Sequence, residues 1–389
     1  MDKDHYTDFL RNKLSIGFFV VIMILSACRD GQPAIQPKDL VGKTDSLLKT
    51  EPDFSGVILL AEKGQPVYHR AFGYTGIGLK TPMDTAAIFE LASISKQFTA
   101  MVIMMLKEEG KLDYDDPLDK YLPGLPYPGI RIRNLLNHTS GLPDYMKIMD
   151  LHWDKSKVAG NDDIIDFLKK YHPPKLFNPG DKFEYSNTGY VLLASIAEHA
   201  SGKNFIVFCR ERIFSPLKMT STAIRTREEK SRLSKATSGS VWIPEKGKYV
   251  PADSIPSTNY NIWLGARKGP GRISSTAADL LKWDQALYSG ILVSQTTLTG
   301  AFTPARLNND SLSAYGFGWM LRLSTPYGRV VYHTGDNPGY STEIIRYLDQ
   351  EKTIIQYSFT TPFFLLARRQ IILFITFAMK VSCTSTNSK

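Results

Sequence analysis

The sequence contains few of the residues that build metal centres and disulfide frameworks. Among its 389 residues are three cysteines, Cys28, Cys209 and Cys383, and seven histidines. The cysteines are too far apart for a disulfide framework or a zinc motif, and no two histidines form a His-x-x-x-His pair. We therefore expect neither a catalytic metal nor a fold held together by disulfide bonds.

The sequence also lacks a clustered run of basic residues, although its formal net charge is +9. Lysine and arginine are scattered along the chain and do not alternate with aromatic residues as in nucleic-acid-binding segments. A dispersed positive balance is typical of an ordinary charged surface, so we expect no nucleic-acid partner. With 43% hydrophobic and 22% charged residues, the chain has a globular composition and the length of one large or two ordinary domains.

No apolar run reaches the length of about 20 residues that a membrane-spanning helix needs. The first apolar run, 14–27, follows three basic residues. Its last three residues and the next one form the sequence Leu-Ser-Ala-Cys28. Basic, apolar and small residues in this order are typical of a secretory signal. The ending resembles a bacterial lipobox, which implies that Cys28 becomes the first residue and carries acyl chains. A plain secretory signal or an uncleaved anchor is the alternative.

This N-terminal pattern predicts a location. We assign 1–27 to a lipoprotein signal peptide and the polar stretch 28–38 to a tether. More than one acyl chain holds a protein stably on a membrane. The sequence therefore predicts a lipid-anchored protein of the bacterial cell envelope, on the periplasmic or outer face, with the membrane as a partner.

The spacing of apolar residues changes along the chain. Residues 54–75 read as two strands around a polar turn at Lys63–Gln65, which predicts a β-hairpin. After Ser93 the apolar residues follow i, i+3, i+4 spacing, which predicts a buried helix that ends near Gly110. Strand patterns return late in the chain, at 328–335, 341–349 and 352–358.

Helical patterns occupy the middle of the chain. One predicted helix ends at Gly202, and another begins with a capping box of Thr276 and Asp279 and closes at Gly290. Strands at both ends with helices between them predict an α/β (α+β) fold, an antiparallel sheet flanked by helices with a mostly helical insertion at about 97–265. We place this domain at 39–358 and a tail of atypical composition at 359–389.

Ser93 precedes Lys96 by three residues where the helix is predicted to begin. Residues three apart lie on one helical face, so the hydroxyl and the amine can approach each other. The positive end of the helix dipole favours an oxyanion formed by serine attack. Lys96 accepts the proton only if burial or a second cation lowers its pKa. Alone, the pair also fits an ordinary helix start with a solvated lysine.

Two further motifs distinguish Ser93 from other serines with the same spacing. Ser-x-x-Lys recurs at Ser46/Lys49 and Ser215/Lys218, whereas Tyr-x-Asn occurs only at 185–187 and His-Thr-Gly only at 333–335. With these motifs in this order, the sequence resembles the serine penicillin-recognising enzymes: class C β-lactamases, low-molecular-weight D,D-peptidases and related esterases and D-amino-acid peptidases. The resemblance runs from about residue 50 to 358.

The resemblance implies a reaction and its catalytic residues. Ser93 would be the acylated nucleophile and Lys96 its proton partner. Tyr185 would be a phenol, lowered in pKa by Lys96, that relays the proton. Asn187 would orient the substrate amide and hold the Lys96 side chain. Water would then hydrolyse the ester without metal or organic cofactor.

Other residues would form the cleft on this resemblance. Backbone N–H groups of Ser93 and Asp336 would make the oxyanion hole. Tyr145 would line the pocket, with an exposed surface aromatic as the alternative. The strand along which the substrate binds would be formed by His333, Thr334 and Gly335.

His333 stands where many relatives of this kind have lysine. A histidine has a reference pKa of about 6.5 and is largely uncharged at neutral pH. A neutral ring lacks the charge-assisted part of a bond to a substrate carboxylate. We therefore expect modest β-lactam turnover and readier cleavage of uncharged esters.

Several alternatives remain open at this point. The substrates would be small molecules or peptidoglycan-like peptides, but an esterase with the same residues and a non-catalytic sensor of peptidoglycan or antibiotic also fit. The tail begins with a helix signature at Thr361 and Pro362, yet it is apolar nearly all round. It fits an altered terminal helix, a membrane-surface contact or a disordered segment.

Overall fold

The computed structural model describes residues 41, 42, 44–46, 48, 54–76 and 81–359. The chain divides into two compact units, Met1–Leu47 with Gln370–Lys389, and Leu48–Arg369. In the first unit the described residues 41, 42 and 44–46 are helical. The predicted signal peptide, Cys28, the tether and the tail beyond Phe359 lie outside the described residues, so those assignments stay predictions.

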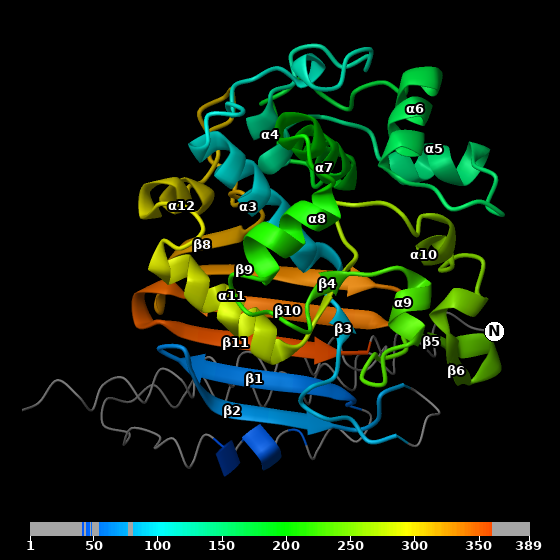
Figure 1. Ribbon diagram of the computed structural model, residues 1–389, viewed down its shortest axis with the longest axis vertical. Helices are drawn as coiled ribbons and strands as arrows, with labels where there is room; N and C mark the ends of the chain where they lie inside the picture. The colour runs from blue at the N-terminus through cyan, green and yellow to red at the C-terminus, as the bar shows by residue number, and fades with distance from the viewer. Residues whose placement is uncertain (1–40, 43, 47, 49–53, 77–80, 360–389) are drawn as a thin grey trace, which may run out of the picture. The chain divides into compact units, whose positions relative to one another are not determined.

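The second unit is built on a six-stranded sheet with the order β2-β1-β11-β10-β9-β8 (Figure 1). All five neighbouring pairs are antiparallel, which confirms the predicted sheet. The first and last strands of the unit pair with each other, with Gly56 opposite Ser358. The strands are β1 Gly56–Glu62, β2 Gln65–Phe72, β8 Met320–Thr325, β9 Gly328–Asn337, β10 Tyr340–Tyr347 and β11 Lys352–Ser358.

The predicted hairpin at the start of the sheet is confirmed as β1 and β2. Its turn residues Lys63 and Gly64 both have positive φ, 49° and 74°. Two residues of positive φ give the type I′ turn that matches the twist of a tight hairpin. β1 is buried over Gly56–Ala61, which explains its near-continuous apolar sequence.

Ten helices are described in this unit, and they lie largely between β2 and β8 in the sequence. The buried helix predicted to start close to Ser93 is confirmed as α3, which begins at Ser95. Gly202 and Gly290 end α7 and α11 in the left-handed conformation, as expected. The helices are α3 Ser95–Glu108, α4 Ile132–Leu136, α5 Tyr145–His152, α6 Asn161–Tyr171, α7 Asn187–Ser201, α8 Phe205–Cys209, α9 Arg227–Ser231, α10 Tyr260–Trp263, α11 Ala277–Ser289 and α12 Gln295–Ala301.

The capping box predicted for α11 is only half present. The Thr276 hydroxyl accepts the Asp279 N–H at 3.2 Å, as a cap should. The Asp279 carboxylate instead accepts the N–H of Ser221 at 2.8 Å and the hydroxyl of Thr222 at 3.0 Å. A long-range contact therefore replaces the reciprocal bond that the local pattern predicted.

Two smaller sheets, five short 3₁₀ helices and one π-helix, η3, complete the unit. The three-stranded sheet has the order β3-β7-β4, and β5 pairs with β6. These strands are β3 Phe89–Glu90, β4 Ala223–Ile224, β5 Ser240–Ile243, β6 Lys248–Pro251 and β7 Ile273–Ser275. These short helices are η1 Ala92–Ile94, η2 Leu118–Lys120, η3 Arg210–Phe214, η4 Pro244–Lys246, η5 Ala252–Ser254 and η6 Leu348–Gln350.

The core lies around α3. This helix is buried at every residue from Ser95 to Leu106 and packs on α7, while α11 packs on β1 and β11 (Figure 1). β3 leads directly into η1 and α3, and it pairs with β7, Glu90 opposite Ser274. This pairing fixes the loop that precedes β7 beside the start of α3, where the candidate site lies.

Candidate active site

The candidate nucleophile sits in a tight turn. Ser93 is half-buried in η1, between β3 and α3. Ala92, directly before it, has a φ of +47°, a left-handed conformation that residues other than glycine rarely adopt. Such strain is concentrated at functional sites. The turn therefore places the Ser93 hydroxyl ahead of the first turn of α3.

Lys96 is buried beneath Ser93 and makes three hydrogen bonds. Its side chain is 0% exposed. The Nζ atom lies 3.1 Å from Ser93 Oγ, 2.8 Å from Asn187 Oδ1 and 3.0 Å from the carbonyl oxygen of Pro270. Burial, and secondly the positive charge of Arg267, hold the pKa of Lys96 well below its usual value. This lowered pKa favours the neutral amine, which can accept the serine proton.

Local sequence features explain how two loops place the hydrogen-bond partners of Lys96. In the Tyr-Ser-Asn motif the middle residue, Ser186, caps α7 by accepting the N–H of Gly189, which fixes Asn187 at the first position of the helix. In the loop before β7, Gly269 has a φ of +106°. A Cβ there would lie 2.0 Å from the carbonyl oxygen of Tyr190, so only glycine lets the loop approach and present the Pro270 carbonyl.

Tyr185 lies beside Lys96 but has the opposite pKa shift to the one we expected. The Lys96 Nζ atom is 4.7 Å from the centroid of the Tyr185 ring, and the His138 ring is 4.3 Å from it. Burial raises the pKa of Tyr185, against a smaller lowering by its hydrogen bond with Ser93. The expectation of a lowered pKa is wrong, because the desolvation of the buried phenolate outweighs the lowering contribution. Tyr185 therefore keeps its proton.

His333 is buried in β9 with both ring nitrogens engaged. Its side chain is 1% exposed. The Nδ1 atom donates to the carbonyl oxygen of Thr334 at 2.6 Å, so Nε2 accepts the hydroxyl of Tyr315 at 2.8 Å. Burial first, and the Lys96 charge second, lower the pKa of His333 to about 3. The ring is therefore neutral and internal, whereas the sequence placed it on the wall that meets the substrate.

The rest of the motif forms an open strand edge. Met320 of β8 pairs with Tyr332 of β9, and among the described residues the pairing of these two strands does not continue beyond Tyr332 toward Asn337. A Cβ on Gly335 would lie 2.1 Å from the carbonyl oxygen of Leu91, so glycine permits β9 to pack against the start of η1. Asp336 is exposed at this edge. The geometry is that of a strand that a substrate can extend.

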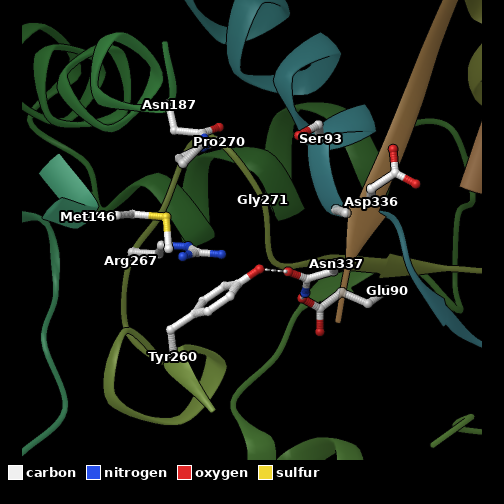
Figure 2. Close-up of a pocket in the computed structure, with 11 residues that line it drawn as sticks. Glu90, Ser93, Met146, Asn187, Tyr260, Arg267, Pro270, Gly271, Asp336 and Asn337 are labelled. Carbon is white, nitrogen blue, oxygen red and sulfur yellow. Dashed lines mark hydrogen bonds between the residues drawn. The ribbon is translucent and has the colours of Figure 1, made fainter. Parts of the chain in front are cut away.

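A small pocket opens in front of Ser93 (Figure 2). Its cavity volume is about 50 Å³. Three of the residues predicted for the site line it, namely Ser93, Asn187 and Asp336. Its other lining residues, which sequence reasoning missed, are Glu90, Ala92, Met146, Tyr260, Arg267, Pro270, Gly271 and Asn337.

Tyr145 does not line the pocket but supports a residue that does. It is 1% exposed, so the alternative of a surface aromatic is wrong. Its hydroxyl accepts a hydrogen bond from Arg267 Nη1 at 3.2 Å.

The residues that the sequence analysis missed gave little signal in the sequence. Arg267 lies in none of the three motifs on which the resemblance rests, and neither does Tyr315.

The serines with the same lysine spacing are not in comparable surroundings. Ser215 and Lys218 are both exposed. Ser46 is exposed in the first unit, and Lys49 lies outside the described residues. In the described part of the chain, no three His, Cys, Asp or Glu side chains gather as a metal-binding group, and no helix is long and apolar enough to cross a membrane.

Comparisons with known proteins agree with this architecture. The family model described as Beta-lactamase matches residues 44–373. Penicillin-binding protein 4* of Bacillus subtilis (strain 168) is 45% identical over 306 residues, which cover 78% of this chain and 68% of the relative. The chain thus has a relative of known family over most of its length.

Two solved structures show the same fold. A D-amino acid amidase from Ochrobactrum anthropi SV3, complexed with L-phenylalanine amide, aligns with a TM-score of 0.71 at 27% identity, over 88% of this chain and 99% of that one. An octameric penicillin-binding protein homologue from Pyrococcus abyssi aligns with a TM-score of 0.72 at 25% identity, over 85% and 77%.

Proposed function

The chain belongs to the beta-lactamase family, and from this premise we propose that it is a serine hydrolase that works through an acyl-enzyme on Ser93. The observation that carries the proposal is the 3.1 Å separation between Ser93 Oγ and the fully buried Nζ of Lys96. A nucleophile within hydrogen-bond reach of a base with a lowered pKa is the arrangement that activates a serine.

In the proposed acylation, Lys96 Nζ accepts the hydroxyl proton while Ser93 Oγ attacks the carbonyl carbon. The negative charge that develops on the carbonyl oxygen would be stabilised by the backbone N–H groups of Ser93 and Asp336. The bond to the leaving group then breaks, and Tyr185 donates its proton to the departing atom. Because burial raises its pKa, the phenol is protonated at neutral pH and holds the proton that this step requires.

Deacylation reverses the same steps with water in place of the leaving group. A water molecule gives a proton to the Tyr185 phenolate left by acylation and attacks the ester carbon. The bond to Ser93 Oγ then breaks, and Oγ takes back the proton held by Lys96 as the acid product leaves. Asn187 would keep Lys96 in place during both acylation and deacylation, since its Oδ1 accepts a hydrogen bond from Lys96 Nζ at 2.8 Å. The chain's own side chains thus supply every proton transfer.

The substrates we propose are amides or esters of small molecules or peptides. The names of the relatives, a penicillin-binding protein and a D-amino acid amidase, support acyl donors of these two kinds. The neutral ring of His333 supplies no charge for a carboxylate at that end of β9. We therefore propose modest β-lactam turnover and readier cleavage of esters that are uncharged there.

Mass spectrometry of the intact protein after incubation with a penicillin and, separately, a fluorophosphonate tests this proposal. A lasting penicilloyl adduct indicates a penicillin-binding protein, rapid turnover a β-lactamase, and labelling by the fluorophosphonate alone an esterase. No adduct and no turnover with either reagent would mean a non-catalytic binder and contradict the proposal. Ser215→Ala, at an exposed serine with the same lysine spacing, is the matched control and should label normally.

We also propose that Cys28 carries the lipid that holds the enzyme at the cell envelope. Cys28→Ser should move the protein from the detergent-requiring fraction to an unprocessed or soluble form. The hydrolytic rate of the folded domain should stay unchanged. Wild-type protein without lipid on Cys28 would contradict the anchor and favour a plain secretory signal.

A further inference from the structure

The pocket in front of Ser93 contains a buried arginine whose hydrogen-bonding capacity is only partly used. Arg267 is 8% exposed, and Figure 2 shows its guanidinium directed into the pocket. Nη1 donates to the Tyr145 hydroxyl at 3.2 Å, and Nε has no hydrogen-bond partner. A guanidinium has five N–H donors and stays charged in proteins, so this side chain brings a permanent positive charge with free donors.

The buried carboxylate of the pocket does not neutralise this charge by direct contact. Glu90 also lines the pocket, but its Oε1 accepts Asn337 Nδ2 at 2.6 Å and its Oε2 pairs with Lys230. In the described part of the chain, no ion pair joins Arg267 to an acid. Glu90 therefore stabilises Arg267 only at longer range. A buried charge without a paired acid is unfavourable unless a ligand completes it.

The position of Tyr185 tells which part of a substrate reaches this pocket. A group that protonates the departing atom must lie on the leaving-group side of Ser93. Tyr185 lies near His333, with 6.2 Å between ring centroids, and neither residue lines the pocket. The pocket is lined instead by Asp336 and Asn337, farther along β9. The leaving group thus lies toward His333 and the acyl part toward Arg267.

We propose that Arg267 forms an anion-binding subsite that recognises a carboxylate on the acyl part of the substrate. This inference rests on the proposed acyl-enzyme at Ser93 and adds a substrate class to it. The guanidinium group that is directed into the pocket can donate charge-assisted hydrogen bonds to a carboxylate. Asp336, the exposed acid at the rim, disfavours the anion on its own side and directs it toward Arg267.

Arg267 has a second effect that the test must separate from recognition. Its charge lowers the pKa of Lys96, so its loss alters proton transfer for every substrate. Recognition of an anion, in contrast, changes the ratio of rates between a charged substrate and its neutral counterpart. The ratio of the two rates is therefore the decisive quantity. The rate for the neutral substrate measures the loss of activity that is common to all substrates.

The experiment compares 4-nitrophenyl hydrogen adipate, whose acyl part ends in a carboxylate, with its methyl ester. For the wild-type enzyme we expect kcat/KM to be at least about tenfold higher for the acid, as charge-assisted bonds allow. Arg267→Gln should reduce this ratio to about one, while Arg267→Lys retains part of it because the charge remains. Arg225→Gln removes a half-buried arginine that bonds Ser274 outside this pocket, and it should leave the ratio unchanged.

Equal ratios in the wild type and Arg267→Gln would overturn the subsite while leaving the hydrolase intact. Absence of turnover for both esters in the wild type would overturn the hydrolase and the subsite with it. A measurement without variants covers the case in which Arg267→Gln does not fold. Free adipate should inhibit hydrolysis of the neutral ester competitively, whereas adipamide should not, and equal inhibition by both would overturn the subsite.

Discussion

The two ends of the candidate active site bury a basic side chain to a similar depth with opposite results. At one end His333 is 1% exposed, and its pKa falls to about 3 because burial disfavours the charged ring. At the other end Arg267 is 8% exposed and keeps its charge. Desolvation neutralises an imidazole easily, whereas a guanidinium resists deprotonation. The comparison shows that the available positive charge lies at the end opposite to the motif histidine.

The largest expected effect tests whether Ser93 is the reacting group between these two ends. Ser93→Ala should lower kcat/KM for all acyl substrates by about 10⁴-fold or more, as loss of a nucleophile does. Steady-state hydrolysis of a neutral 4-nitrophenyl ester measures it. Ser215→Ala should keep the wild-type rate. A Ser93→Ala enzyme with normal turnover would show that Ser93 is not the nucleophile, and the two ends would then not be defined relative to it.

The next effect tests the assignment of the His333 end to the leaving group. Tyr185→Phe should lower the rate by about 10²–10⁴-fold for an alkyl ester, whose leaving oxygen needs a proton. The loss should be smaller for a 4-nitrophenyl ester, because nitrophenolate leaves without protonation. Measuring kcat for both esters in one variant gives the answer. A uniform loss would place Tyr185 in serine activation instead.

A smaller effect concerns the influence of Arg267 on Lys96. Because the charge of Arg267 contributes to the low pKa of Lys96, Arg267→Gln should raise that pKa. Lysine must be neutral to accept a proton, so activity rises with pH through its pKa. The acid limb of the pH profile for a neutral ester should therefore move to higher pH. The control Arg225→Gln should leave the acid limb unmoved. An unmoved limb in Arg267→Gln would show that Arg267 does not influence the pKa of Lys96.

The smallest expected effect is a null result at the His333 end. A ring with a pKa of about 3 does not titrate between pH 5.5 and 8.5. Rates for esters with and without a carboxylate on the leaving group should therefore change in parallel over this range. Kinetics with both esters across the range measure the ratio. A preference for the carboxylate that grows toward pH 5.5 would show a titrating, accessible His333.

The sequence predicted the parts of the site that depend on local spacing. Ser93 and Lys96 are one turn apart, and the Tyr-Ser-Asn motif places Asn187 at a helix start, so both patterns could be recognised in isolation. The hairpin and the late strands followed from alternation and turn residues for the same reason. The predicted roles of these residues stay predictions until they are tested chemically.

The remaining features depend on contacts between distant segments. Arg267 meets Tyr145 across 122 positions, and no local pattern relates them. The resemblance implied a lowered pKa for Tyr185, but a sequence motif does not show the burial that raises it. The resemblance implied that His333 lies on the cleft wall, and no local pattern shows that its ring contacts Tyr315 instead. Each of these features depends on the burial of side chains by distant segments, which the sequence shows least directly.

Identification of the acylated residue tests the central claim most directly. After reaction with a fluorophosphonate, tryptic digestion should release the peptide Thr81–Lys96, which ends at the proposed base and contains Ser93. Fragmentation of this peptide by mass spectrometry should locate the added mass on Ser93, and the Ser93→Ala protein should remain unlabelled. An adduct on a different peptide, or hydrolysis of the neutral ester by a Ser93→Ala protein, would contradict the account.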